Sequence, residues 1–542
     1  MTEATMTLDG SVALDTHAAH RPKLDSGFDA RTAVIFFSVL ALALFFVAYS
    51  IYVDVNETGV RTTNVLPYVL LGVALLVALG FEFVNGFHDT ANAVATVIYT
   101  HSLPAQLAVL WSGLFNFLGV LVSSGAVAYA IVALLPVELI LQVGSSAGFA
   151  MVFALLIGAI IWNLGTWFLG LPASSSHTLI GSILGVGLAN QLMASSAAGA
   201  SGVDWGQAAK VGYSLLLSPL IGFGLSALLL LTLKLTVRLP ALYAEPRRDA
   251  PPPWWIRGIL ILTCTGVSFA HGSNDGQKGM GLIMLILIGV VPTAYALNRA
   301  MPDSEIQPFL QTSTYVAQTL DRYSTAGPIT DPRTVIGDYL RTRQPDAHVV
   351  TALAMLSRDV KTQVEQSGSF RRMPADRVQN VRNDMYLASE TIRRFGKDET
   401  VKLAKPDADL LKLYRGELDA ATRFIPTWVK IAVAIALGLG TMVGWKRIVV
   451  TVGEKIGKTH LTYAQGASAE LVAAITIAAA DIYGLPVSTT HVLSSGVAGT
   501  MAANRSGLQM ATVRNLLMAW VLTMPAAILL SGSLFWVFAK VF

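Results

Sequence analysis

The segment at 170–177 reads GLPASSSH, and a second segment at 484–491 reads GLPVSTTH. Each lies within a long apolar stretch of the chain. In both segments the proline ends the preceding helix, and the hydroxyl side chains after it can cap the next helix. Irregular backbone at membrane depth is tolerated only where protein or a cavity surrounds it. The two segments therefore predict two re-entrant hairpins in a membrane-embedded chain.

A second pair of similar segments occurs in the chain, one ahead of each hairpin segment. GFHDTANAVAT at 86–96 resembles GSNDGQKGMGL at 272–282, which aligns Asp89 with Asp275. The two Asp residues are 186 positions apart and the two hairpins 314 positions apart. The difference of 128 is close to the 124 residues of the polar stretch at 301–424. The second half of the chain is therefore a copy of the first half, with a polar domain inserted into it.

Composition indicates where this chain resides. Of its 542 residues, 53% are hydrophobic and 13% are charged, whereas soluble chains usually carry about 25% charged residues. The apolar residues come in blocks, and a spanning helix needs about 20 of them. We expect an all-α polytopic protein of the lipid bilayer with broken helices and about 10 to 12 crossings. The net charge of +4 does not indicate a nucleic-acid partner, and the single Cys264 provides neither a disulfide framework nor a cysteine metal cluster.

Changes in polarity along the chain predict its domains. Positive residues favour cytoplasmic loops, which makes the loops at 234–257 and 444–458 candidates for that side. The predicted divisions are a polar tail at 1–31, a first spanning helix and loop at 32–66, membrane repeat 1 at 67–237, the start of membrane repeat 2 at 238–300, a soluble, mostly helical insert at 301–424, and the remainder of repeat 2 at 425–542.

Two halves with interrupted hydrophobic segments at matching positions are typical of secondary transporters whose site lies between the repeats. We expect the repeats to be inverted, since inversion allows alternating access around a fixed central site.

The two repeated acidic residues are the first candidates for that site. A charge in the middle of a membrane costs about 2.5 kcal/mol or more on insertion scales, so such residues are commonly functional. A single Asp could cap a helix at the membrane surface, but Asp89 and Asp275 stand at matching positions beside Gly and Asn residues. The pattern favours a binding site, with both carboxylates as candidate metal ligands and proton carriers.

The hairpins offer a complementary set of groups. Helix N-termini suit an anion, and Ser175, Ser176, Thr489 and Thr490 add hydroxyl donors. Ordinary capping of two tight turns is the structural alternative. His177 and His491 follow these residues, as orienting groups or proton carriers, or simply as packing residues.

Together the motifs imply cotransport. Carboxylates repel an anion such as phosphate, so an anion can enter only with a proton, Na⁺ or a divalent metal between them. Hydroxyl and amide groups can coordinate either species.

The motifs at 86–96, 272–281 and 484–491, with FNFLG at 115–119 and YAQ at 463–465, resemble the inorganic phosphate transporter (Pit) family, and its bacterial low-affinity branch in particular. The resemblance implies an inverted-repeat fold and symport of phosphate with a cation. For bacterial members it implies proton coupling, uptake of neutral metal–hydrogen phosphate and a place in the inner membrane. We expect no bound cofactor, and a homodimer is compatible with these features.

One position departs from the internal repeat, because Lys278 aligns with Asn92. A fixed ammonium could stand where Na⁺ would otherwise bind, or pair with Asp275 or phosphate, and we expect it to favour proton coupling. Snorkelling of Lys278 to the membrane surface is the alternative. The predicted substrate-binding set is Asp89, Asn92, Ser175, Ser176, Asn274, Asp275, Lys278, Thr489 and Thr490, and the predicted set for cation or proton coupling is Asp89, Asp275, Glu470, His177 and His491.

Four other functions are alternatives to proton-coupled phosphate symport. Na⁺-coupled phosphate symport and transport of another oxyanion such as sulfate use the same kinds of group, although sulfate has no proton to donate at neutral pH. A membrane-embedded phosphohydrolase is suggested by His88 beside Asp89, but the second repeat offers Asn274 beside Asp275, which leaves too few metal ligands. We therefore expect no enzyme activity. ATP-driven transport would need a phosphate-binding P-loop, which the sequence lacks.

Overall fold

The fold comes from a computed structural model of the full chain. The residues that it describes are 22, 24, 30–59, 65–193, 203–246, 251–327, 329–342, 344, 346–396 and 401–541, without the side chains of 90–92.

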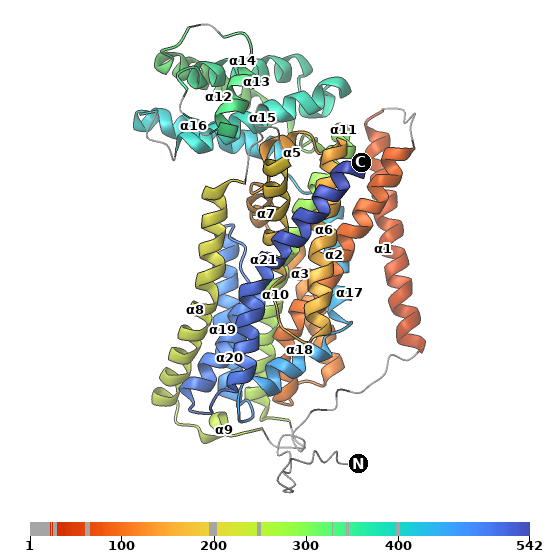
Figure 1. Ribbon diagram of the computed structural model, residues 1–542, viewed down its shortest axis with the longest axis vertical. Coiled ribbons are helices and arrows are strands. Elements are labelled where there is room, and N and C mark those ends of the chain that lie inside the picture. The colour runs from red at the N-terminus through yellow and green to blue at the C-terminus, as the bar shows by residue number, and fades with distance from the viewer. Residues whose placement is uncertain are drawn as a thin grey trace.

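The described chain is a tall bundle of helices with a cap of shorter helices at one end (Figure 1). The α-helices are α1 (Ala30–Glu57), α2 (Leu66–Tyr99), α3 (Ala105–Val122), α4 (Ala126–Val132), α5 (Val137–Leu141), α6 (Ser146–Phe168), α7 (Ser175–Met193), α8 (Trp205–Thr236), α9 (Pro240–Tyr243), α10 (Trp254–Val290), α11 (Pro292–Tyr295), α12 (Ile306–Tyr323), α13 (Pro332–Thr342), α14 (Val349–Ser367), α15 (Ala375–Phe395), α16 (Lys405–Thr422), α17 (Thr427–Thr441), α18 (Lys446–Val450), α19 (Tyr463–Ile482), α20 (Thr489–Ala503) and α21 (Met510–Val541).

Seven of the described helices are long and apolar enough to cross a membrane, or up to eight if α16 and α17, bent by 71°, count as one span. The protein is thus an all-α multi-pass membrane protein, as predicted. Only helices that are long and apolar enough by themselves are included in this number, so the predicted 10 to 12 crossings stay a prediction. The apolar blocks at 147–195 and 462–505 each contain one long helix, a turn and a shorter helix that starts inside the protein.

The two hairpins have the same backbone design. Gly170 and Gly484 adopt left-handed conformations, with φ of 67° and 62°. Leu171 donates its amide to Thr166, and Leu485 donates to Ala480. This hydrogen bond to the carbonyl five residues earlier closes a helix C-terminus. Each chain then turns at Pro172 or Pro486 and re-enters the protein as α7 or α20.

Helices of the two halves pack across each other in matching pairs. In the hairpin regions α7 packs against α21 and α20 against α8, while around the Asp motifs α2 packs against α17 and α10 against α3. A Cβ on Gly86 would lie 2.2 Å from the carbonyl oxygen of Leu437, and one on Gly272 would lie 2.1 Å from that of Asn116. Only glycine allows these helices to approach so closely. The inverted relation of the repeats stays a prediction.

The helices α12 to α16 lie within the predicted insert and form the cap in Figure 1. They pack on one another around buried residues such as Leu353, Val381 and Tyr414. The short helices α9 and α18 lie toward the opposite end of the bundle (Figure 1). The predicted domain boundaries stay predictions.

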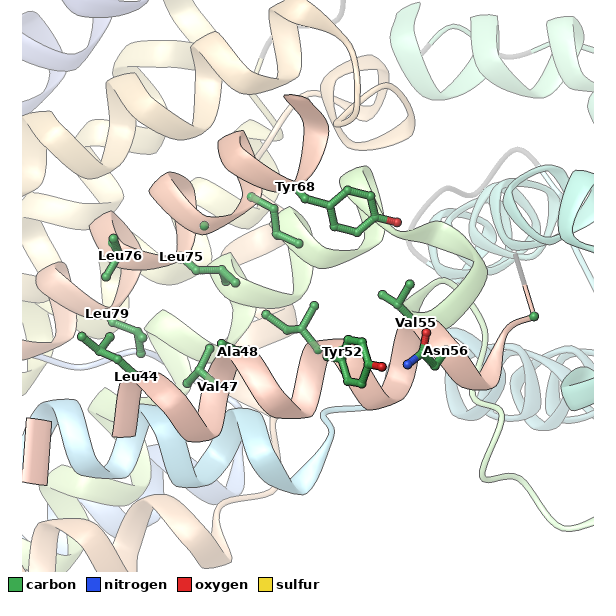
Figure 2. Close-up of a pocket in the computed structure, with 14 residues that line it drawn as sticks. Leu44, Val47, Ala48, Tyr52, Val55, Asn56, Tyr68, Leu75, Leu76 and Leu79 are labelled. Atoms are coloured by element: carbon green, nitrogen blue, oxygen red, sulfur yellow. The ribbon is translucent and has the colours of Figure 1, made fainter. Parts of the chain in front are cut away.

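Helix α1 stands at the edge of the bundle, and between it and α2 lies a cavity of about 950 Å³. Its walls are mainly leucine, valine and alanine, with Tyr52, Asn56 and Tyr68 toward one end (Figure 2). None of the predicted site residues lines it. A cavity of this composition suits hydrocarbon and does not suit a small anion.

Candidate functional site

Asp89, on α2, is the centre of a buried polar cluster. Hairpin 1 denotes the segment at 170–177 with α7, and hairpin 2 the segment at 484–491 with α20. Asp89 accepts hydrogen bonds from Ser175 Oγ of hairpin 1 and from Thr490 Oγ1 of hairpin 2, the latter at 2.7 Å. His88 Nδ1 lies 3.1 Å from Asp89 Oδ1, and its Nε2 lies 3.2 Å from Thr166 Oγ1. Both hairpins therefore converge on the Asp motif of the first repeat.

Asp275, on α10, has different surroundings. Its Oδ2 lies 2.7 Å from Lys278 Nζ and accepts a long hydrogen bond of 3.5 Å from Ser175 Oγ. His271 Nε2 lies 3.4 Å from the same oxygen, without the geometry of a hydrogen bond. Among the described residues Asp275 Oδ1 has no hydrogen-bond partner. This free oxygen can accept a proton or coordinate a cation.

Lys278 is fully buried and does not snorkel to the membrane surface. Besides Asp275, its Nζ lies 2.5 Å from Ser176 Oγ of hairpin 1. Ser176 in turn donates to the carbonyl oxygen of Val487 in hairpin 2, at 2.7 Å. Hairpin 1 thus contacts the Asp motif of the second repeat, just as Thr490 of hairpin 2 contacts Asp89 of the first. The cluster lies at the interface between the repeats.

The remaining predicted substrate-binding residues have other placements. Asn274 donates to the carbonyl oxygen of Leu485 and accepts from the amide of Val487, so it holds the turn of hairpin 2. Thr489 Oγ1 is buried and, within the described part of the chain, lacks a hydrogen-bond partner. The side chain of Asn92 lies outside the described residues.

Capping of the hairpin helices is carried out by neighbours of the predicted hydroxyls. Ser174 Oγ accepts from the amide of His177, and Ser488 Oγ accepts from the amide of His491. These two serines accept from free backbone amides at the N-termini of α7 and α20. Ser175 and Thr490, in the first turns of these helices, can therefore face the carboxylates.

The hairpin histidines lie ring to ring beside this cluster. The rings of His177 and His491 have centroids 4.5 Å apart, and Trp520 of α21 stacks on His491 at 4.2 Å. No hydrogen bond joins either ring to Asp89 or Asp275 in the described structure. A packing role is therefore as well supported as proton transfer.

Glu470 lies apart from the Asp pair. It is fully buried on α19 and accepts from Thr96 Oγ1 of α2 and from Thr263 Oγ1 of α10, the latter at 2.5 Å. Its partners belong to the same two helices that carry Asp89 and Asp275. Glu470 is therefore part of a second polar cluster on these helices.

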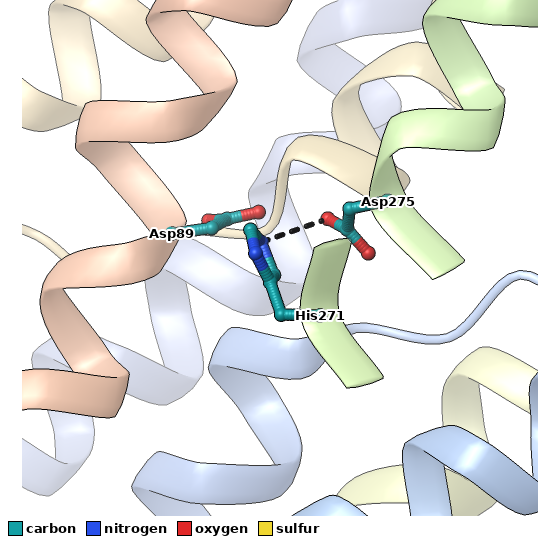
Figure 3. Close-up of side chains that lie close together, drawn as sticks. All are labelled: Asp89, His271 and Asp275. Atoms are coloured by element: carbon teal, nitrogen blue, oxygen red, sulfur yellow. Dashed lines mark ion pairs between the residues drawn. The ribbon is translucent and has the colours of Figure 1, made fainter. Parts of the chain in front are cut away.

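Three residues of the site were not predicted. His271 joins Asp89 and Asp275 in a buried group whose potential ligand atoms all lie within 4.8 Å of one another (Figure 3). Asn116 Oδ1 lies 2.8 Å from His271 Nδ1, which leaves Nε2 directed at the carboxylates. Glu82 is fully buried on α2, and its carboxylate occupies the space that a side chain at Gly279 would need.

The group in Figure 3 could hold a cation. Two carboxylates and one imidazole provide two oxygen ligands and one nitrogen ligand, and the free Asp275 Oδ1 and His271 Nε2 have no competing hydrogen bond among the described residues. Asp89, His271 and Asp275 are each at most 3% exposed. In a site so dry, charges interact far more strongly than in water.

Comparisons with known proteins find similar phosphate transporters in bacteria. The low-affinity inorganic phosphate transporter PitA of Escherichia coli (strain K12) is 45% identical over 496 residues, which cover 86% of this chain and 96% of PitA. PitB of the same organism is 42% identical over 489 residues, with the same coverage. A probable low-affinity inorganic phosphate transporter of Bacillus subtilis (strain 168) is 28% identical, over 88% of this chain and 98% of its own. A solved structure titled as the sodium-dependent phosphate transporter covers 88% of this chain and 100% of its own at 20% identity, with a TM-score of 0.48.

The family model for phosphate transporters matches residues 85–531. This range includes both Asp motifs, both hairpins, the group of Asp89, His271 and Asp275, and Glu470. The named relatives are transporters rather than enzymes, in agreement with the prediction from the missing metal ligands. The chain belongs to the phosphate transporter family.

Proposed function

We propose that this protein imports inorganic phosphate across the bacterial inner membrane by secondary active symport with protons. The observation that carries the proposal is the meeting of both hairpins at Asp89, where Ser175 and Thr490 donate to one carboxylate. Donors from two repeats at one point can be separated and rejoined when the repeats move. Phosphate binds among these hydroxyls, Ser176 and Lys278.

The charges of the site explain why a cation accompanies the anion. Asp89 and Asp275 contribute two negative charges, and Lys278 offsets one of them at 2.7 Å. Monoanionic phosphate would then face a net negative site in a dry environment, which is strongly unfavourable. One or more protons on the cluster remove this repulsion, and the free oxygen of Asp275 is one acceptor.

We propose further that phosphate enters as a metal–hydrogen phosphate complex, and the same cluster supports this. Asp89, His271 and Asp275 could contact the metal of such a cargo while the hydroxyls contact its phosphate. Imidazole is a better ligand for transition metals than for Na⁺, which prefers oxygen alone. Na⁺ coupling remains the alternative, and it would use the carboxylate oxygens without His271.

Uptake of radiolabelled phosphate into proteoliposomes tests the proposal. We expect uptake in the absence of Na⁺ to follow an imposed inward proton gradient, to rise with a divalent metal and to vanish in Asp89→Asn. The matched control is Asp54→Asn, since Asp54 also accepts two hydrogen bonds, from Tyr295 and Trp428, away from the cluster. Uptake that requires Na⁺ would overturn proton coupling, and equal competition by sulfate would overturn phosphate specificity.

The same proposal includes an orientation. The helices α9 and α18, which belong to the basic segments at 234–257 and 444–458, lie toward the end of the bundle opposite the insert (Figure 1), so the positive-inside rule directs the insert toward the periplasm. A cysteine at the half-exposed Asp338 should react with an impermeant maleimide in intact spheroplasts. Native Cys264 is buried and serves as the internal blank. Labelling only after lysis would reverse the orientation.

A further inference from the structure

The insert meets the membrane helices at a buried group of arginines. Helix α15 of the insert carries Arg382, Tyr386 and Glu390, and these line a small pocket together with Tyr129 of α4 and Arg423. The inner wall of the pocket is formed by Gly281, Met284, Leu285 and Ile288 of α10. The pocket is therefore a junction of the insert with the helix that also bears Asp275.

Arg382 is the unusual member of this group. Its side chain is only 6% exposed, yet no carboxylate lies within 4 Å of it in the described part of the chain. Its guanidinium contacts the Asn383 side chain at 3.2 Å and the ring of Tyr386 at 5.2 Å, while its Nε has no hydrogen-bond partner among the described residues. Burial lowers the pKa of Arg382. An isolated buried charge of this kind costs several kcal/mol unless an opposite charge compensates it.

The neighbouring carboxylates are already occupied by other arginines. Glu390 pairs with Arg423 at 2.8 Å and with Arg393. Arg393 also pairs with Asp204 at 3.0 Å. Asp419 lies between Arg423, at 3.2 Å, and Arg415, at 3.7 Å. Three carboxylates thus balance three arginines, and the charge of Arg382 remains unmatched.

We propose that the pocket binds one halide-sized inorganic anion, chloride in the cell, between the guanidinium groups of Arg382 and Arg423. The space in which a water-sized particle can be centred is about 30 Å³, so the pocket is small but has room for a monatomic anion. The bound anion completes the charge balance and holds α15 against α4 and α10. This site is separate from the Asp89 cluster, and its test does not depend on transport.

Thermal unfolding of the purified full-length protein tests the site. Sodium chloride is compared with sodium gluconate at equal ionic strength, because gluconate is too large for the pocket. We expect chloride to raise the Tm by about 2 °C or more, and Arg382→Gln to abolish this rise. The matched control is Arg377→Gln, which removes an exposed arginine of the same helix and should retain the rise.

Three outcomes would overturn the proposal. These are no difference between chloride and gluconate in the unmodified protein, a difference that survives in Arg382→Gln, or a rise with phosphate but not with chloride that Arg382→Gln removes. If Arg382→Gln does not fold, bromide provides a direct probe. Crystals grown in bromide should give an anomalous peak beside Arg382, and a map without a peak there would overturn the proposal as well.

Discussion

Asp89 and Asp275 occupy equivalent positions in the two repeats, but their neighbours differ in charge. Asp89 accepts from two neutral hydroxyls, one from each hairpin. Asp275 is held by the ammonium of Lys278 on the next turn of its own helix. Duplication has kept the scaffold, including the glycine contacts between helices, while the electrostatics of the two halves have diverged. We infer that Lys278 compensates the charge of Asp275 within the protein.

The largest expected effect is the difference in stability between variants that remove the charge of Asp275 and of Asp89. Asp275→Asn leaves Lys278 buried without a counter-charge, which typically costs about 3–5 kcal/mol. Asp89→Asn should be better tolerated, because the carboxamide keeps one oxygen acceptor for one of the two hydroxyls of Ser175 and Thr490, and its NH2 group can donate to the other. Chemical unfolding of both variants measures the difference.

The double variant Asp275→Asn/Lys278→Met is the control for this comparison. It removes both charges together, so we expect stability to recover toward that of the unmodified protein while phosphate uptake stays absent. Equal stability of Asp275→Asn and Asp89→Asn would show that the Asp275–Lys278 pair does not contribute specially to the stability of the fold.

The glycine contacts test whether the scaffold is as similar as the geometry indicates. Gly86→Ala and Gly272→Ala would each place a methyl group within 2.2 Å of a backbone oxygen. We expect both to destabilise by similar amounts, about 1–3 kcal/mol or more. Gly80→Ala on α2 is the control, because its Cβ would meet no atom within 4 Å, and it should stabilise by up to about 1 kcal/mol. A large inequality between the first two variants would contradict equivalent packing.

Local and duplicated signals made much of this predictable from sequence. The hairpins follow from a proline and hydroxyl residues in an apolar stretch, and the Asp pair from repeated charges there. Lys278 lies three residues after Asp275, so their contact on one helix face is readable from spacing. That Ser176 reaches Lys278 from the other half is not readable, since it depends on how the repeats pack.

The residues that escaped prediction lacked one of these signals. Glu82 also interrupts an apolar run, but its equivalent in the second repeat is Ser268, so comparison of the halves did not reveal it. His271 lies one turn before Asp275, and only the packing of α10 against α2 brings it near Asp89. Block length alone cannot distinguish a full span from a helix that begins inside the protein, so the number of crossings stays a prediction.

Lys278→Asn gives the second repeat the residue type that the first repeat has at Asn92. It thereby reduces the difference in charge between the two Asp motifs. If the ammonium occupies the place of a cation, its removal should open a site for Na⁺. We expect the ratio of Na⁺-driven to proton-driven uptake to rise about tenfold, which corresponds to about 1.4 kcal/mol of differential binding. Lys278→Arg keeps the charge and should leave the ratio low. An unchanged ratio in Lys278→Asn would refute a role of Lys278 in ion selection.

The smallest effect is expected where the repeats are most alike. Ser174 and Ser488 cap α7 and α20 through nearly identical hydrogen bonds of 3.2 and 3.1 Å. Ser174→Ala and Ser488→Ala should therefore each cost about 1 kcal/mol, measured by unfolding of the two variants in parallel. Replacement by Thr, whose neutral hydroxyl also caps helices, should restore stability to both. A difference above about 1 kcal/mol between the alanine variants would mean that the divergence seen at Asp89 and Asp275 extends into the hairpin backbone, because a cap reports only on its own helix end.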